Sequence, residues 1–497
     1  TNTSDVRLMC LTGRKDPFAP LVSGRVRMYV CGVTVYDDCH LGHARSAVVF
    51  DVIRRYLEHR GLTVTFVKNF TDVDDKIINR ANQLGIPWQD VTTRYIEAYS
   101  RDMGRLGVLK ATEEPKATEH MDDIVRLVRT LIEKGVAYQV AGGVYFQVSK
   151  YPDYGRLSKR KLDEMQAGAR VEVDERKRHP MDFALWKGAK AGEPAWPSPW
   201  GPGRPGWHIE CSAMSIRHLG ETFDIHGGGQ DLIFPHHENE IAQSCAATGK
   251  EFARYWVHNG FVTVDQEKMS KSLGNFFTIK EIFEKFPAPE KVTAEVVRYF
   301  LLSTQYRSPI DFSDAALLQA WSGLNNFYDL FKRLDELAGE KGQKDAEVQR
   351  EEESLQSFFE QAMDEDFNTP EALGALQKFR STVNKLLTDG LSASAGRGAL
   401  AAFRKYGELL GLFQVQTKNW QFIQNYLALG IPLTVEMRPA APTVVFVHPT
   451  EIERQIAERN EARRNKDFVR ADEIRKALAA QGIILEDRPD GTTRWKR

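Results

Sequence analysis

Arg25-Val26-Arg27-Met28-Tyr29-Val30-Cys31 begins the pattern that decides the fold, and its apolar and β-branched content predicts a short strand. Apolar residues then recur at helical spacing over 41–60, and Gly61 follows where helices commonly end. A β-branched run over 62–67 predicts a second strand, and 74–84 predicts a second helix. This order predicts a Rossmann-like, doubly wound parallel sheet, which binds ligands beyond the carboxyl ends of its strands.

Two short motifs have the chemistry to hold a polyphosphate. His40-Leu41-Gly42-His43 follows the first predicted strand, and its imidazoles can donate to a triphosphate while Gly42 lets a nucleotide approach the backbone. Lys268-Met269-Ser270-Lys271-Ser272 supplies two mobile ammonium groups, which suit a departing pyrophosphate. A lysine- and serine-rich loop is by itself usually a solvated surface. Together, in this order, the two motifs predict a reaction that holds and then expels a triphosphate fragment.

Four residues far apart in the sequence form a chemically sensible zinc shell. Cys31 is placed at the end of the first strand, and Cys211 follows Trp207-His208-Ile209-Glu210. His236 and Glu240 are four apart on a helix predicted over 236–247, which puts them on one face. Two thiolates, an imidazole and a carboxylate suit zinc. The alternative is that both cysteines are buried small apolar residues.

Two further segments have both a structural and a functional interpretation. Thr71-Asp72-Val73-Asp74-Asp75-Lys76 could orient an amine or a ribose, but Thr71 or Asp72 could equally cap the following helix. His226 ends a predicted core strand before three glycines, where a ligand could pack against bare backbone. A buried, hydrogen-bonded histidine is the alternative there.

Composition limits the class of protein. The chain has 497 residues, of which 42% are apolar and 27% charged, so several globular domains are expected. A formal net charge of −1 excludes a uniformly basic nucleic-acid binder. Five scattered cysteines indicate reduced thiols rather than a disulfide framework. Without a membrane-length apolar run or a secretory signal, a cytoplasmic protein that does not bind membranes is expected.

The chain is expected to divide into seven segments. A helix at 118–134 and a hairpin around Ala141-Gly142-Gly143 predict an α+β insertion that splits the sheet domain. Beyond 315 the pattern is helical, with connectors expected at 338–353 and 391–398. The predicted boundaries give a first sheet half, the insertion, a second sheet half, the lysine-motif region, an all-α bundle, a linker and a small C-terminal α/β module, at 1–110, 111–200, 201–255, 256–315, 316–414, 415–450 and 451–497.

The motifs together resemble the class I aminoacyl-tRNA synthetases, and within them the cysteinyl-tRNA synthetases. The resemblance runs along nearly the whole chain, and Leu41 stands where the family usually has Ile. It is densest over Tyr29 to Tyr36, His40 to His43, Thr71 to Lys76, Pro205 to Met214, Asp224 to Gln243 and Lys268 to Asn275.

The resemblance implies a reaction and a role for each motif. It implies that ATP-dependent ligation of L-cysteine to tRNA(Cys) passes through cysteinyl-adenylate, with Mg²⁺ accompanying ATP and one Zn²⁺ per monomeric chain selecting the thiolate. The implied zinc ligands are Cys31, Cys211, His236 and Glu240. The implied catalytic residues are His40, His43, Lys268 and Lys271, joined in the ATP site by Gly42, Gly228, Asp231 and Ser270. The implied amino-acid pocket contains Thr34, Thr71, Trp207 and His226, and residues 451–497 are implied to recognise the anticodon.

Three other functions compete with this one. A cysteine ligase of the mycothiol type, acting on a glucosamine-inositol acceptor, would share the catalytic core but have no use for residues 316–497. A zinc hydrolase would leave two phosphate motifs unused, and His236-His237-Glu238-Asn239-Glu240 does not match the H-E-x-x-H metalloprotease pattern. A non-catalytic RNA-binding protein would have to explain the same motifs and a near-neutral charge.

Overall fold

The computed structural model describes residues 6–9, 11, 13–160, 176–264, 267–268, 277–339, 342–420 and parts of 456–496. These residues fall into two compact units, Thr1–Leu429 and Gly430–Arg497. Lys271, Ser270, the side chain of Lys268 and the predicted capping box at 450–453 lie outside the described residues. Among the described helices, none has the length and apolar character needed to cross a membrane.

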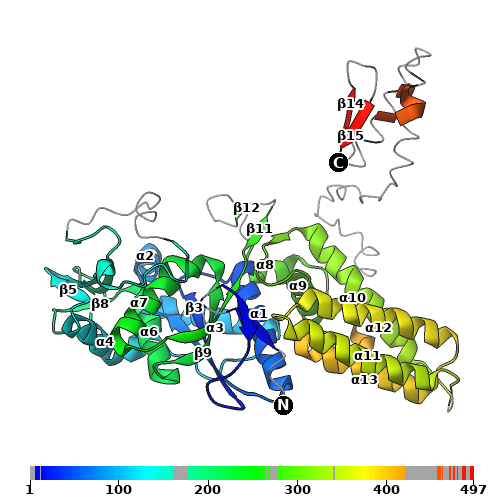
Figure 1. Cartoon of the computed structure of the whole chain (residues 1–497), viewed down its shortest axis with the longest axis horizontal. Coiled ribbons are helices and arrows are strands. Elements are labelled where there is room, and N and C mark those ends of the chain that lie inside the picture. The colour runs from blue at the N-terminus through cyan, green and yellow to red at the C-terminus, as the bar shows by residue number, and fades with distance from the viewer. Residues whose placement is uncertain are drawn as a thin grey trace. The chain divides into compact units, whose positions relative to one another are not determined.

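A four-stranded parallel sheet is the centre of the first unit, as the sequence predicts (Figure 1). Its strand order is β10-β9-β3-β4. The strands are β3 (Arg25–Thr34), β4 (Thr63–Thr71), β9 (Phe223–Gly229) and β10 (Ala253–Asn259). The last of these crosses the domain boundary predicted after residue 255. The helices around the sheet are α1 (Leu41–His59), α2 (Asp75–Leu84), α3 (Trp88–Arg105), α6 (Trp207–Leu219) and α7 (Glu238–Thr248).

Local chemistry explains where these elements begin and end. His40 caps α1, and Gly61 follows the helix with a φ of 81°. The cap of α2 is Asp74, whose carboxylate accepts from Lys76 N, so the predicted caps Thr71 and Asp72 are wrong. Asp72 instead accepts from the backbone and hydroxyl of Thr118.

Strand β9 divides the domain into two chemical environments, because successive residues of a strand point to opposite faces. A Cβ at Gly227 would lie 2.3 Å from the ring of Phe50 on α1. The neighbouring His226 faces the other side, where its Nε2 lies 2.9 Å from Glu240 on α7. The glycine run is therefore part of the strand and is covered by the protein's own side chains, so the predicted bare backbone for a ligand is wrong at Gly227.

The insertion is an α+β unit, as predicted, but its sheet is larger than the expected hairpin. Four antiparallel strands pair in the order β5-β6-β7-β8. Two of them lie in 150–206, where a loop-rich stretch was expected, and Asp182 closes that stretch by binding Tyr138 and Val148. The elements are η2 (Ala117–His120), α4 (Met121–Glu133), β5 (Ala137–Val140), β6 (Gly143–Phe146), η3 (Val148–Lys150), β7 (Phe183–Gly188) and β8 (Gly203–Pro205).

A helical bundle follows the catalytic part, and both predicted connectors are too long, because α11 begins at Asp345 and α13 at Ala393. Residues 345–353 belong to a helix because their charged side chains face solvent while Val348 is buried. The small residues of 391–398 begin another helix, where a Cβ at Gly396 would lie 2.5 Å from Leu337. The bundle helices lie side by side in Figure 1 and are α10 (Asp314–Asp335), α11 (Asp345–Asp364), α12 (Thr369–Thr388) and α13 (Ala393–Leu410).

Smaller elements complete the described structure. In the first unit they are β1 (Arg7–Met9), β2 (Lys15–Pro17), η4 (Gln230–Leu232), η5 (Ile233–His237), β11 (Val262–Val264), β12 (Glu267–Lys268), α8 (Ile279–Lys285), α9 (Glu290–Leu302), β13 (Ile310–Phe312) and η7 (Thr417–Asn419). In the second unit β14 (Ile484–Asp487) pairs antiparallel with β15 (Thr493–Lys496), on either side of the predicted turn at 489–491.

Gly32→Ala tests how tightly β3 and β4 are joined. A Cβ at this position would lie 1.5 Å from the carbonyl oxygen of Asn69, so the strands must separate. Overpacking of this kind costs about 1–3 kcal/mol, and we expect a lower thermal midpoint by calorimetry. Gly104→Ala is the matched control, because nothing lies within 4 Å of its Cβ position. Equal midpoints for the two variants would contradict the close approach.

Candidate active site with a buried thiol, imidazole and carboxylate cluster

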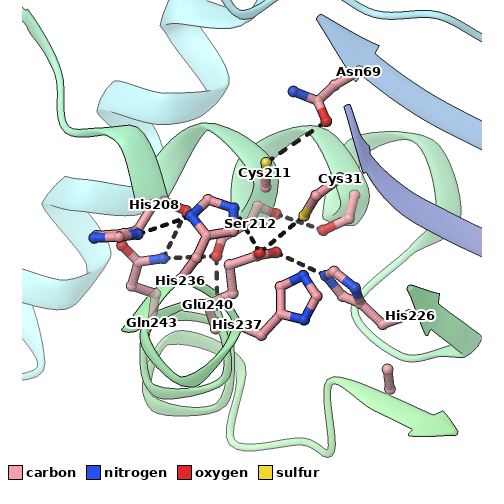
Figure 2. A network of polar contacts seen from close by, with 12 residues as sticks. Cys31, Asn69, His208, Cys211, Ser212, His226, His236, His237, Glu240 and Gln243 are labelled. Atoms are coloured by element: carbon pink, nitrogen blue, oxygen red, sulfur yellow. Dashed lines mark hydrogen bonds and ion pairs between the residues drawn. The ribbon is translucent and has the colours of Figure 1, made fainter. Parts of the chain in front are cut away.

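Cys31, Cys211, His236 and Glu240 meet beside the sheet, although they come from four different elements. Their potential ligand atoms all lie within 4.8 Å of one another, and all four residues are buried (Figure 2). Cys31 is supplied by β3 at a register shift between Val30 and Val33, and the strand continues to Thr34 rather than ending at the thiol. Cys211 projects from α6 and Glu240 from the start of α7. His236 lies in η5, the π-helical segment just before α7, because α7 begins at Glu238 and not at residue 236 as predicted.

The carboxylate of Glu240 is the centre of this cluster. Its Oε1 lies 3.2 Å from Cys31 Sγ and 3.1 Å from His236 Nε2, and its Oε2 lies 2.9 Å from His226 Nε2. Burial raises the pKa of Glu240, but His226 and His236 outweigh burial and hold this pKa at about 2. The buried side chain is therefore a carboxylate.

The buried groups of the cluster shift one another's pKa values. A hydrogen bond from Cys31 lowers the pKa of Cys211 to about 6, whereas burial and Cys211 raise that of Cys31. Burial lowers the pKa of His236, but Glu240 and Cys211 reverse the effect and raise it to about 10. A proton on His236 thus provides the positive charge beside two buried anions. A metal ion bound by the same four side chains would supply positive charge in place of this proton.

Outer contacts orient the imidazole toward the cluster. His236 Nδ1 lies 2.9 Å from His208 Nδ1, while its Nε2 is a buried atom without a hydrogen bond of normal geometry. Burial lowers the pKa of His208, so His208 is neutral and can accept from His236. This arrangement leaves His236 Nε2 available as a ligand, as is usual for metal-binding histidines.

A second set of donors overlaps the first. Cys31, His226, His237 and Glu240 also lie close enough to share an ion. In this set, however, a metal on His226 Nε2 would displace its bond to Glu240. The first set has two sulfur donors and keeps that bond. The geometry and the donor set therefore favour Cys31, Cys211, His236 and Glu240.

The predicted amino-acid residues lie around this cluster. Trp207 stacks on His236 with ring centroids 4.1 Å apart and is 38% exposed, so it forms a partly open wall. Thr34 and Thr71 are register partners at the carboxyl ends of β3 and β4. His226 is fully buried and contacts Glu240 through its Nε2.

His40 and His43 begin α1 with their rings stacked, with centroids 3.7 Å apart. His40 Nδ1 accepts from Gly42 N at 3.0 Å, and His43 Nδ1 accepts from His40 N at 3.4 Å. Burial and His40 lower the pKa of His43, which keeps its ring neutral. Because Nδ1 is an acceptor, the proton of neutral His43 is on Nε2, as a phosphate donor requires.

The far end of the lysine motif returns to the same place. Phe277 O accepts from Leu41 N at 3.1 Å, and Cys39 O accepts from Ile279 N at 2.9 Å. The chain that contains Lys268 and Lys271 therefore re-enters the described structure beside His40. Gly228 is buried, and a Cβ there would lie 2.9 Å from Leu232, while Asp231 is exposed.

Sequence reasoning missed several residues that support the cluster. His208, Asn69 and Gln243 have no diagnostic spacing, yet Asn69 Oδ1 accepts from Gly32 N and lies 3.7 Å from Cys211 Sγ. Gln243 donates to His208 O and to Ser212. Only the position of His208 next to Trp207 could have suggested its role.

Comparisons with known proteins agree with this arrangement. Family models match the chain over three segments: the tRNA synthetases class I (C) catalytic domain over residues 17–322, the DALR domain over 358–414 and the cysteinyl-tRNA ligase anticodon binding domain over 448–495. The chain is 55% identical over 496 residues to cysteine–tRNA ligase of Geobacter metallireducens, with 98% of each chain covered. It is 50% identical to cysteine–tRNA ligase of Thermodesulfovibrio yellowstonii, again with 98% of each covered.

Solved structures share the fold at low sequence identity. Methionyl-tRNA synthetase of Mycobacterium tuberculosis in complex with methionyl-adenylate aligns with a TM-score of 0.59 at 16% identity, covering 82% of this chain and 96% of that one. A LeuRS–tRNA–LeuAMS ternary complex from Agrobacterium radiobacter aligns with a TM-score of 0.58 at 14% identity, covering 82% and 88%.

His258→Gln tests the neutral histidines behind the cluster. Burial, His226 and Arg307 lower the pKa of His258 to about 3, against about 6.5 in an unfolded chain. As pH falls below about 6.5 the unfolded chain binds the proton first, so this histidine destabilises the fold in acid, by about 1.4 kcal/mol at pH 5.5. We expect thermal midpoints at pH 7.5 and 5.5 to differ less in the variant than in the unaltered chain. An unchanged difference would contradict a neutral His258.

Proposed function

The chain belongs to the cysteine–tRNA ligase family of class I aminoacyl-tRNA synthetases, and from this premise we propose that its buried cluster selects cysteine through one zinc ion. As an enzyme of this family, it ligates cysteine to tRNA at the expense of ATP. The observation that carries the proposal is the convergence of Cys31, Cys211, His236 and Glu240 within 4.8 Å.

The donor set of the cluster suits the selection of a thiol. Cysteine and serine differ by one atom, and an apolar pocket separates such near-isosteres by only about 1–3 kcal/mol. A bound zinc ion would take the substrate thiolate as a ligand and prefer sulfur to a hydroxyl. The chain's own part is to hold the four donors in place, with His208 fixing His236 and His226 fixing Glu240. We propose that His226 affects the amino-acid pocket through this carboxylate.

We propose that adenylate formation takes place beside this pocket, at the start of α1. The cysteine carboxylate attacks the α-phosphate of Mg-ATP, the new O–P bond forms, and the bond to pyrophosphate breaks. His40 and His43 donate to the phosphate oxygens as charge develops there, and Lys268 and Lys271 hold the leaving pyrophosphate. The terminal ribose hydroxyl of tRNA then takes the acyl group and AMP leaves.

The remaining assignments follow the same proposal. Trp207, Thr34 and Thr71 surround the bound amino acid, and Gly42, Gly228, Asp231 and Ser270 contact ATP. The matched family segments support a division into catalytic part, bundle and anticodon module, with matched limits near the proposed boundaries at 414 and 450. The boundaries proposed at 110, 200, 255 and 315 fall inside the matched catalytic segment, 17–322. The proposed enzyme is monomeric. Transfer to an amino sugar instead of tRNA is disfavoured, because the match to cysteine–tRNA ligases extends over 98% of the chain.

Cys211→Ser tests the metal assignment. Replacing a sulfur ligand is expected to reduce zinc well below one ion per chain, since even outer-contact variants cost about 10–100-fold in metal affinity. Cysteine-dependent ATP–pyrophosphate exchange should be lost with it. Zinc content is measured by atomic emission, and exchange with cysteine and with serine in parallel.

Two variants control this experiment. Cys245→Ser changes a cysteine of α7 outside the first donor set and should keep both zinc and exchange. His237→Gln removes a donor of the second set alone and should keep zinc if the first set holds it. Full exchange by a zinc-free Cys211→Ser protein would refute zinc-based selection. Loss of zinc in His237→Gln alone would favour the second set.

Removal of residues 430–497 tests the proposed anticodon module. These residues form a compact unit of their own, and 448–495 match an anticodon binding domain. We expect the shortened chain to retain cysteine-dependent exchange and to lose at least about tenfold in kcat/KM for tRNA(Cys), which corresponds to about 1.4 kcal/mol. Anticodon-altered tRNA is the control substrate. Equal kcat/KM for tRNA(Cys) in the full and the shortened chain would contradict the assignment.

A further inference from the structure

The loop Tyr306–Ser308 joins α9 to β13 and is bound by side chains from two distant parts of the chain. One of these side chains comes from the helix that begins with His40. The other comes from the turn between α11 and α12 of the bundle. The loop is thus a physical link between the proposed adenylate site and the bundle.

Arg45 attaches the loop to the start of α1. It lies two residues after His43, is fully buried, and donates to the carbonyl oxygens of Phe261 at 2.6 Å and Tyr306 at 3.3 Å, and also to that of Ser308. Phe261 precedes β11 and β12, the strands that lead into Lys268. One guanidinium therefore joins the helix that begins after His40 to the segment that leads toward Lys268.

Asp366 attaches the same loop to the bundle. Its fully buried carboxylate accepts from Tyr306 OH at 2.8 Å and from Arg307 Nε and Nη2 at 2.7 and 2.8 Å. The backbone of Asp366 has a φ of 57° and that of Phe367 a φ of 53°. Left-handed backbone at two successive non-glycine residues is unfavourable and persists only where surrounding contacts fix it.

We propose that Asp366 is a positioning residue for adenylate formation, acting through Tyr306, Arg307 and Arg45 on the start of α1. This inference rests on the proposed role of His40 and His43. The carboxylate fixes the loop, the loop carbonyls fix Arg45, and Arg45 fixes the helical turn that contains both histidines. Displacement of reacting groups by about 1 Å can cost about 100-fold in rate, so loosening this chain of contacts slows the ATP step.

The chain offers a closely matched pair of substitutions. Tyr306→Phe removes one phenol hydroxyl that donates to Asp366. Tyr56→Phe removes one phenol hydroxyl that donates to Asp364 at 2.6 Å, also joining the catalytic part to the bundle. Tyr56 lies sixteen residues after His40 on α1, about 24 Å along the helix, and is outside the proposed catalytic and binding groups.

The experiment measures cysteine-dependent ATP–pyrophosphate exchange by the full-length protein, with thermal midpoint and zinc content for each variant. We expect Tyr306→Phe to lower kcat about 5-fold and Asp366→Asn at least about 10-fold, with zinc content and KM for cysteine unchanged. Asn is chosen because it tolerates left-handed backbone and keeps one acceptor oxygen. Tyr56→Phe should lose a similar amount of thermal stability and keep kcat within about 2-fold.

Each other outcome has a definite meaning. If Tyr306→Phe and Asp366→Asn match Tyr56→Phe in kcat, Asp366 has a structural role alone and the inference is wrong. If KM for cysteine or zinc content changes instead of kcat, the contacts of Asp366 act on the cluster that contains Cys31 and Glu240. The inference is then also wrong. Absence of exchange by the unaltered chain would refute the proposed function, and this inference with it.

Discussion

The rest of the site depends on the contacts that the buried carboxylate of Glu240 makes with its neighbours. A charge in this position is tolerated because His226, His236 and Cys31 surround it. Removing one partner from a buried ion pair typically costs about 3–5 kcal/mol, because the remaining charge is left uncompensated. The three elements β3, β9 and α7 must therefore meet at one point for the chain to fold with this carboxylate inside. Folding and the assembly of the metal cluster are in this sense one process.

The same helix also connects the cluster to the insertion. Glu238, fully buried, accepts from the backbone N–H groups of Gly155 at 3.0 Å and Ser158 at 2.7 Å. Asn239 accepts from Tyr154 OH at 2.5 Å. Successive residues of α7 thus hold the insertion and supply a cluster donor. The sheet separates this face from α1, because His226 contacts Glu240 on one side and Gly227 faces Phe50 on the other. The proposed amino-acid selection and the proposed phosphate binding are thus supported by different layers.

The sequence predicts those features that depend on local periodicity. The spacing of His236 and Glu240 is enough to bring both to one cluster, although His236 lies in η5, just before α7. The strand and helix alternation is enough to predict the parallel sheet. It does not reveal His208 or Asn69, because their contacts join residues 28 and 142 positions apart. The charged start of α11 was expected to be a connector. A helix with one narrow buried stripe has few apolar residues at helical spacing, so its sequence pattern is weak. The role assigned to Lys271 remains a prediction, because that residue lies outside the part of the chain that the structure describes.

The position of the cluster explains how discrimination can occur at the first contact with the amino acid. Trp207 is partly exposed and stacks directly on the buried His236, so the indole ring lies between the cluster and the surface. A hydroxyl arriving there competes poorly with sulfur for a soft metal, whereas in an apolar pocket the two groups would be nearly equivalent. Without a metal, the positive charge has to come from a proton on His236, and this proton occupies the nitrogen that would otherwise be a ligand. In the proposed mechanism, loading with metal and selection of the substrate therefore depend on the same nitrogen, His236 Nε2, while Nδ1 of the same ring contacts His208.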